Sequence, residues 1–258
     1  MKVLVFPDAA TASAATAARI VARLHDNPRA VLGLATGGTM EPVYAALRRD
    51  LAGGPVAFTA FNLDEYVGLP ADHPQSYASY MRAHFYDALG VPAAQTHLPR
   101  GDAPDPQAEA DRYEAAIKAA GGIDLQLLGL GANGHIGFNE PISSLGSRTR
   151  VKTLARKTVN DNARFFRPGE EVPHQAITMG IATILEAREI LLLTTGKTKS
   201  RAVAQMIEGP VSAICPASAL QMHPRVTVLL DTASAADLSL REYYEIISKP
   251  GPDNPETL

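Results

Sequence analysis

Short apolar segments alternate along the chain with longer stretches in which apolar residues recur at helical spacing. The short segments predict strands, at residues 3–6, 31–35, 58–63, 124–130, 190–194 and 226–230. The longer stretches predict helices, at residues 11–24, 76–89, 108–120, 179–187 and 240–247, with two more beginning near residues 41 and 197. This alternation is typical of βαβ units, so we expect one doubly wound α/β domain with an open, parallel sheet over residues 1–258.

Two segments depart from this pattern. Residues 131–176 are polar, rich in arginine and without a long, clean period. A segment of this length in a compact domain is usually a lid or a binding segment, so we expect one mobile lid insert, near residues 150–177. Residues 248–258 are polar, and we expect them to be loose.

Composition and charge narrow the function. Of the 258 residues 46% are hydrophobic, which is enough for a sizeable core, and the net charge of −3 provides no overall basic field. The apolar runs are too short to span a bilayer, and the run Val3–Phe6 is too short for the core of a signal peptide. The single cysteine, Cys215, fits a small buried hydrophobe in a reducing compartment. We therefore expect a cytoplasmic protein without nucleic-acid or membrane partners.

Anion-binding candidates follow two of the predicted strands, at the carboxyl ends where open α/β sheets bind ligands. The turn Thr36–Thr39 contains two glycines that could bring backbone N–H groups to an anion, although a plain tight turn is the alternative. Lys197 and Lys199 lie at a predicted helix start, where the helix dipole favours anions over cations. We interpret Lys199 as a phosphate contact and Lys197 as a solvated lysine.

Acid–base candidates follow two further strands. Asp64 and Glu65 come directly after the third strand, where a carboxylate near apolar walls can carry protons; helix capping by Asp64 is the alternative. His135 lies in a glycine-rich segment after the most apolar strand, between Asn133 and Glu140. A histidine flanked by an amide and a carboxylate is typical of an oriented acid or base.

Several other chemistries lack their sequence motifs. The chain has neither G-x-G-x-x-G nor a Walker A loop, which disfavours dinucleotides and ATP. It has no H-E-x-x-H, no second histidine near His135 and no cysteine cluster, so we expect no metal site. It also lacks the G-x-S-x-G motif of a serine nucleophile.

Five strings occur in order along nearly the whole chain. They are LATGGT at 34–39, FNLDEYVGL at 61–69, GLGANGHIGFNEP at 129–141, SSLGSRTRVKTL at 143–154 and GKTKS at 196–200. In content, order and spacing they resemble the glucosamine-6-phosphate deaminases. In the related 6-phosphogluconolactonases the segment after the histidine differs from the Phe-Asn-Glu-Pro found here. The resemblance implies a Rossmann-like sheet without a metal or organic cofactor. It also implies conversion of glucosamine 6-phosphate and water to fructose 6-phosphate and ammonia.

The resemblance also implies roles for individual residues. Asp64 matches the base that moves a proton between C2 and C1, His135 matches the residue that assists ring opening, and Glu140 matches the carboxylate that supports this histidine. Asn133 is a departure, because several members have aspartate here; the lost negative charge gives less support to the cationic form of His135. The implied phosphate-binding residues are Thr36, Gly37, Gly38, Thr39, Arg164 and Lys199.

A second implied site concerns regulation. Ser143, Arg150 and Lys152 match an allosteric site for a sugar phosphate between the subunits of hexameric members, whereas the charge pattern alone indicates only a solvated basic surface. The resemblance implies N-acetylglucosamine 6-phosphate as effector, and a homo-oligomer with a hexamer as the specific expectation. Alternative functions are a galactosamine-6-phosphate deaminase, a 6-phosphogluconolactonase-like enzyme and a non-catalytic sugar-phosphate sensor. The retained Asp64 and His135 disfavour the sensor.

Overall fold

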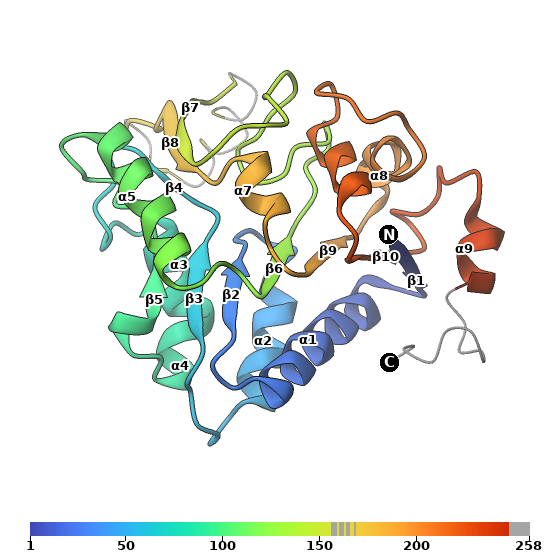
Figure 1. The fold of residues 1–258 in the computed structure, drawn as a ribbon, viewed down its shortest axis with the longest axis horizontal. Helices are drawn as coiled ribbons and strands as arrows, with labels where there is room; N and C mark the ends of the chain where they lie inside the picture. Colours follow the sequence, from blue (N-terminus) through green and yellow to red (C-terminus); the bar gives the residue numbers. More distant parts are fainter. Residues whose placement is uncertain (156–158, 160–162, 164–165, 168, 248–258) are drawn as a thin grey trace.

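The computed structural model describes residues 1–155, 159, 163, 166–167 and 169–247. Its main sheet has seven strands, all paired in parallel, in the order β1-β10-β9-β6-β2-β3-β5. They are β1 (Lys2–Phe6), β2 (Val31–Leu34), β3 (Thr59–Asn62), β5 (Thr96–His97), β6 (Leu125–Leu128), β9 (Ile190–Thr194) and β10 (Val226–Asp231). The open, doubly wound α/β sheet expected from the sequence is confirmed (Figure 1).

The direction of winding reverses between β2 and β6. From β2 the chain adds β3 and then β5 on one side, whereas from β6 it adds β9 and β10 on the other side. Because crossovers between parallel strands are right-handed, the helices of the two halves cover opposite faces of the sheet. The loops that leave β2 and β6 therefore diverge, and this divergence is where open α/β sheets bind ligands.

Helices connect most of the parallel strands. Helix α1 (Ala9–Asp26) begins where the Asp8 carboxylate accepts a hydrogen bond from the Thr11 N–H at 2.7 Å, and it packs against α2 (Glu41–Asp50). Further helical elements are α3 (Tyr77–Met81), a π-helical turn (Arg82–Tyr86), α4 (Asp87–Leu89), α5 (Pro106–Ala119), α7 (Ile181–Leu185), α8 (Ser200–Ile207), α9 (Arg241–Ile247) and 3₁₀ turns at Ala93–Gln95, Lys197–Lys199 and Pro216–Met222. None of the helices in the described part of the chain is long and apolar enough to cross a membrane.

A second, antiparallel sheet lies beyond the carboxyl ends of β2 and β3, at the top of Figure 1. Its strands are β4 (Asp64–Tyr66), β8 (Gln175–Thr178) and β7 (Arg150–Thr153), with β8 in the middle. Tyr66 and Ala176 of this sheet belong to a separate apolar cluster that also includes Phe138. The small sheet therefore has its own hydrophobic support beside the main core.

The small sheet corrects two expectations. The segment 131–176 is not a single insert without regular structure, because β7 and the first residues of β8 lie within it. Asp64 begins a strand and does not cap a helix: the predicted strand 58–63 is β3, and β4 follows it directly in a different sheet. These pairings join residues far apart in the chain and leave no local periodicity that could have revealed them.

Most other predicted elements are confirmed within a few residues. One difference is that the helix expected from Lys197 opens as a 3₁₀ turn, and α8 begins only at Ser200. The short strand β5 and the 3₁₀ turn Pro216–Met222 carry no clear pattern and were not predicted. Cys215 is buried, as expected.

The main core lies along the central strands. β6 and β9 are buried over their whole length, as expected for strands covered on both faces. The switch point between β2 and β6 is tightly packed, because a Cβ atom on Gly33 would lie 2.1 Å from Oε1 of Gln126. Only glycine fits at position 33 with Gln126 in this place.

Candidate active site

The loops that leave β2, β3, β6 and β9 surround one pocket of about 280 Å³. It lies at the carboxyl edge of the main sheet, where the winding reverses. Its lining consists of Ala35, Thr36, Gly37, Gly38, Thr39, Met40, Leu63, Asp64, Tyr77, Gly129, Leu130, Gly131, His135, Gly137, Phe138 and Lys199. The structure thus brings together the glycine turn, Asp64, His135 and Lys199 from four separate parts of the chain.

One side of the pocket is suited to an anion. Gly37 has φ 105°, a backbone conformation that favours glycine, and its carbonyl oxygen accepts a hydrogen bond from the Tyr80 hydroxyl at 2.9 Å. The turn Thr36–Thr39 therefore has a fixed shape, with two hydroxyls and two exposed glycines. Lys199 lines the same pocket from the residue before α8. Backbone N–H groups, hydroxyls and an ammonium group are the usual ligands of a phosphate.

Asp64 provides a carboxylate in a dry environment. Its side chain lies at the first residue of β4 and is buried. Burial, followed by the charge of Glu65, raises the pKa of Asp64 to about 8, while a hydrogen bond from Thr178 acts in the opposite direction. A carboxyl group that gains and loses its proton near neutral pH is suited to carrying a proton.

Glu65 has a different task although it is adjacent. Its carboxylate accepts hydrogen bonds from the backbone N–H groups of Tyr66 at 2.9 Å, Tyr77 at 3.0 Å and Ala78 at 3.0 Å. Burial raises its pKa to about 7, and these three hydrogen bonds oppose the shift. Glu65 therefore attaches the start of α3 to β4 and so positions Tyr77, which lines the pocket.

His135 is oriented by Asn133. The Asn133 Oδ1 atom lies 2.6 Å from Nδ1 of His135, and because an amide oxygen can only accept, Nδ1 carries the proton. Nε2 is then the unprotonated nitrogen of the neutral ring. Burial first, and then the charge of Lys199, lower the pKa of His135, whereas Glu140 acts to raise it. A neutral histidine that lines the pocket can accept a proton from a bound hydroxyl.

Two glycines shape the histidine loop. A Cβ atom on Gly131 would lie within 2.4 Å of three His135 ring atoms, so the ring packs directly against this backbone. Gly134, with φ 83°, faces Cys215, whose sulfur would lie 2.6 Å from an added Cβ atom. The loop therefore requires glycine at both positions.

Glu140 lies behind the histidine. It is buried, it does not line the pocket, and its Oε2 atom accepts a hydrogen bond from the Ala155 N–H at 3.1 Å. Its charge still acts on the pKa of His135. Glu140 can therefore influence His135 electrostatically without touching a ligand in the pocket.

Ser143, Arg150 and Lys152 do not line this pocket. Arg164 lies outside the described residues. Ser143 is buried, and its hydroxyl has no hydrogen-bond partner within the described part of the chain. Arg150 and Lys152 are two residues apart in β7, so their side chains leave the same face of the small sheet. The Arg150 Nη1 atom donates to Oδ1 of Asn139 at 2.9 Å.

Two residues at the site were missed by the sequence analysis. Tyr77 lines the pocket from the first turn of α3, and Thr178 pairs across the small sheet with Asp64. Neither residue belongs to a motif with recognisable chemistry, and only the tertiary structure brings them to the site. Among the residues that the structure describes, no three His, Cys, Asp or Glu side chains gather as ligands of a metal ion would.

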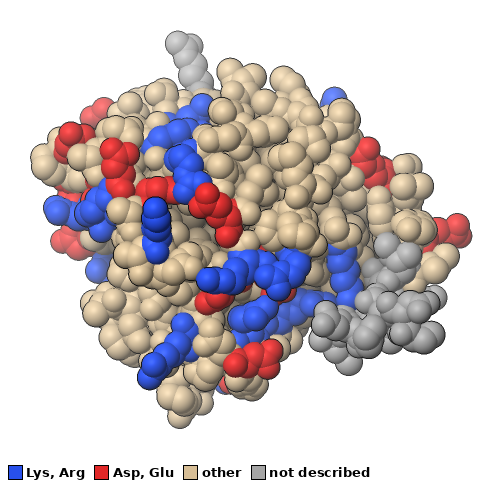
Figure 2. Space-filling view, viewed as in Figure 1, with Lys and Arg blue, Asp and Glu red and all other residues tan. Residues whose placement is uncertain are grey.

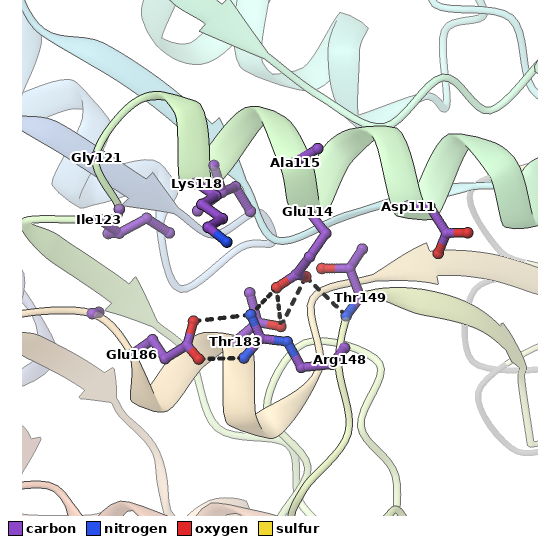
Figure 3. A pocket seen from close by; sticks show the side chains of 13 residues that line it. Asp111, Glu114, Ala115, Lys118, Gly121, Ile123, Arg148, Thr149, Thr183 and Glu186 are labelled. Carbon is purple, nitrogen blue, oxygen red and sulfur yellow. Dashed lines mark hydrogen bonds and ion pairs between the residues drawn. The ribbon is translucent and has the colours of Figure 1, made fainter.

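A larger hollow of about 720 Å³ lies between α5 and α7 (Figure 3). Arg148 lies there between two carboxylates, with Nη1 at 2.5 Å from Glu186 and Nη2 bonded to Glu114. Glu114 also accepts hydrogen bonds from the Thr183 hydroxyl at 3.0 Å and the Thr149 N–H at 3.1 Å. These charges are paired with each other, and the hollow contains none of the predicted catalytic residues.

A third hollow of about 660 Å³ lies at the amino edge of the main sheet, opposite the candidate site. Figure 2 shows basic side chains gathered over α1 and the neighbouring strand ends on this face. Lys2, Arg19, Arg23 and Arg225 line the hollow, and Arg23 forms an ion pair with Glu189. This basic surface is separate from the pocket that holds Asp64 and His135.

Fold and pocket together define an α/β protein that holds a carboxylate and a histidine beside a glycine-containing turn suited to an anion. The family of glucosamine-6-phosphate isomerases and 6-phosphogluconolactonases matches residues 7–229, and the chain belongs to this family. The resemblance found in the sequence strings is thereby confirmed.

Individual relatives agree with this assignment. The chain is 51% identical over 250 residues to a glucosamine-6-phosphate deaminase of Shewanella loihica, covering 96% of this chain and 93% of the relative. It is 52% identical over 247 residues to one of Hahella chejuensis, covering 95% and 94%. A solved monomeric glucosamine-6-phosphate deaminase matches with a TM-score of 0.88 and 44% identity over 92% of this chain and 99% of that chain. A 6-phosphogluconolactonase from Trypanosoma cruzi matches with a TM-score of 0.74 at 23% identity over 92% of this chain and 97% of that chain, which shows the shared fold.

Proposed function

We propose that this protein is a glucosamine-6-phosphate deaminase, which converts glucosamine 6-phosphate and water to fructose 6-phosphate and ammonia. The observation that carries the proposal is the pocket in which Asp64 and His135 lie beside the turn Thr36–Thr39 and Lys199. Relatives that are about half identical over nearly the whole chain are glucosamine-6-phosphate deaminases. The enzyme is thus an isomerase and deaminase of amino-sugar metabolism.

The residues divide the reaction between anchoring and proton transfer. Thr36–Thr39 and Lys199 hold the phosphate, far from the reacting carbons, and Arg164 is predicted from the sequence to join them. His135 accepts the proton of the ring hydroxyl at Nε2, which opens the pyranose. Asn133 orients the His135 ring, and the charge of Glu140 acts to raise the pKa of His135.

Asp64 then acts on the open-chain sugar. Its carboxylate removes the proton from C2, which gives an enolamine, and returns that proton to C1, which gives a 2-imino sugar. Water adds to the C2 imine and ammonia leaves, so that C2 becomes the ketone of fructose 6-phosphate. Asp64 carries the proton from C2 to C1, and its raised pKa makes its carboxylate a stronger base for this step.

An assay of ammonia release tests this function and separates its alternatives. Glucosamine 6-phosphate should release ammonia, whereas galactosamine 6-phosphate should do so more slowly because its C4 hydroxyl is inverted. Faster turnover of the galactosamine substrate would favour the epimeric deaminase. Hydrolysis of 6-phosphogluconolactone without ammonia release from either amino sugar would favour the lactonase. Binding without turnover of any of them would favour a sensor.

We also propose an allosteric site formed by Ser143, Arg150 and Lys152, with N-acetylglucosamine 6-phosphate as effector and a cytoplasmic homo-oligomer, specifically a hexamer. The buried Ser143 hydroxyl without a partner in the described residues supports a ligand there. The solved relative at 44% identity is a monomer, so the oligomeric state is a direct test. Light scattering should show the hexamer, and the effector should make sigmoidal saturation curves hyperbolic. A monomer with unchanged kinetics would contradict the proposal.

One domain over residues 1–258 with a lid near residues 150–177 remains a prediction from the sequence.

A further inference from the structure

Thr178 is a buried polar residue next to the proposed base. It ends β8 and is the direct antiparallel partner of Asp64 in β4. Its side chain is fully buried, and both strands belong to the small sheet beside the pocket. The register therefore places a hydroxyl beside the Asp64 carboxylate on the protein side, away from solvent.

The hydrogen bonds around Thr178 fix the direction of its hydroxyl proton. The Phe138 N–H donates to Oγ1 of Thr178 at 3.1 Å, so the hydroxyl accepts there and must donate elsewhere. One acceptor is the carbonyl oxygen of Met179, at a long 3.4 Å. That oxygen already accepts from Nδ2 of Asn139 at 2.8 Å. The other acceptor is the carboxylate of Asp64, with which the hydroxyl also interacts. An ionised carboxylate is a stronger acceptor than a carbonyl oxygen, so the hydroxyl proton points to Asp64 whenever Asp64 is ionised.

Gly137, in the loop that carries His135, packs against both Thr178 and Asp64. A Cβ atom at this position would lie 3.0 Å from Oγ1 of Thr178 and 3.3 Å from Oδ2 of Asp64. Gly137 also has φ 54°, so its backbone favours glycine for a second reason. The loop that carries His135 therefore packs directly on the pair and supplies the Phe138 N–H that orients it.

We propose that Thr178 is a positioning residue for the reaction: its hydroxyl, oriented by the Phe138 N–H, donates to the Asp64 carboxylate and holds it ionised and aimed at the substrate. The inference rests on the proposed function, because it assumes that Asp64 is the base. It adds a residue from a strand that contains none of the motifs of the site.

Other ionisable groups surround Asp64, and some of them act on the pKa that the Thr178 hydroxyl is proposed to lower. Glu65 is adjacent in β4, and its charge adds to burial in raising the pKa of Asp64. Tyr77 from α3 and Tyr113 from α5 also interact with the Asp64 charge, and both have strongly raised pKa values of their own. His135 faces the same pocket. Of these groups Glu65 is the one whose charge raises the pKa of Asp64, so the Thr178 hydroxyl is a neutral donor that opposes burial and the Glu65 charge.

The test compares three variants by pH–rate profiles of ammonia release. Thr178→Val removes the hydroxyl at similar volume and should lower kcat about tenfold with little change in KM. It should also move the acidic limb of kcat/KM upward by about one pH unit, because the base loses a donor to its charged form. Thr178→Ser keeps a hydroxyl and should restore the wild-type limb.

Thr183→Val is the matched control. Thr183 is also a buried threonine whose hydroxyl donates to a carboxylate, but its partner is Glu114 in the other hollow. Its pH–rate profile should equal that of the wild type. Should Thr178→Val fail to fold, as judged by circular dichroism, Thr178→Ala provides the same comparison without the branched side chain.

A second readout separates this inference from the proposed function. The titration of the Asp64 carboxyl carbon, followed by ¹³C NMR and assigned with Asp64→Asn, needs no turnover. The midpoint of this Asp64 titration should move to higher pH in Thr178→Val and should stay in place in Thr183→Val. An unchanged Asp64 titration and pH–rate limb in Thr178→Val would overturn the inference. Absence of ammonia release from the wild type would overturn only the proposed function.

Discussion

Asp64 in the candidate site and Glu114 in the hollow of Figure 3 are carboxylates in opposite electrostatic surroundings. Burial and neighbouring Glu65 raise the pKa of Asp64 to about 8. Burial also acts to raise the pKa of Glu114, but hydrogen bonds from Thr149 and Thr183 and the charge of Arg148 together lower it. The difference teaches that hydrogen-bond donors together with a nearby cation keep a carboxylate ionised, whereas burial beside a second carboxylate leaves it able to exchange protons near neutral pH.

Replacement of the Asp64 carboxylate should have the largest effect on kcat. Asp64→Asn should lower kcat by about 10²–10⁴-fold, the usual contribution of a general base. KM should change little, because the phosphate contacts remain. Single-turnover and steady-state ammonia release measure both constants. Retention of more than about a tenth of the wild-type kcat would show that Asp64 is not the base.

Removal of the pocket's lysine should affect binding more than chemistry. Lys199→Ala should raise KM about tenfold, because it removes a charge-assisted contact to a phosphate that is present throughout the reaction. Lys197→Ala is the control, since Lys197 is exposed and does not line the pocket. Equal KM values for the two variants would remove Lys199 from the phosphate site.

Removal of the neighbouring negative charge should make Asp64 resemble Glu114 more closely. In Glu65→Gln the pKa of Asp64 should fall, because a charge that raises it is gone. A base works in its ionised form, so the acidic limb of kcat/KM should move to lower pH, by less than about one unit. A limb that stays in place would show that Glu65 does not act on the base.

Addition of a negative charge near the histidine should give a smaller shift. Asn133→Asp should raise the pKa of His135, because Oδ1 of Asn133 lies 2.6 Å from Nδ1 and a carboxylate there favours the imidazolium. The pH optimum of ammonia release should move upward. Identical profiles for the variant and the wild type would mean that position 133 orients His135 without tuning it.

Replacement of Glu114, the carboxylate paired with Arg148, should lower stability and leave catalysis unchanged. Glu114→Gln should lower Tm by a few degrees, about 1 kcal/mol, with wild-type kcat. Because the folded-state pKa of Glu114 is depressed, its stabilisation is present above the ordinary carboxyl pKa and is lost as pH falls through the folded value. The Tm difference between variant and wild type should therefore narrow in acid. A large loss of kcat at neutral pH would contradict the separation of the two regions.

The main sheet could be predicted because its signals are local. The apolar run that forms β9 and the helical spacing within α1 are visible in a few consecutive residues. The small sheet could not be predicted in this way, since β4 has only three residues and pairs with a strand from a distant part of the chain. The length of a strand limits how much periodicity it can show.

The site could be predicted in part for a related reason. Asp64, His135 and Lys199 each follow a predicted strand, and parallel strands bring their carboxyl ends to one edge. Thr178 follows no such rule, because it reaches the site through antiparallel pairing with Asp64. The placement of Glu140 behind His135 also depends on how the loop folds back, which spacing along the chain does not determine.

The pairing of Asp64 with Thr178 has a consequence for folding. The two residues are more than a hundred positions apart in the chain, and joining them closes a long loop. Loop closure of this kind costs conformational entropy before any contact rewards it, so distant strand pairs form slowly compared with helices such as α1. We therefore expect the carboxylate to acquire its partner later than the helices form. A refolding chain should regain its helical signal before its ability to release ammonia.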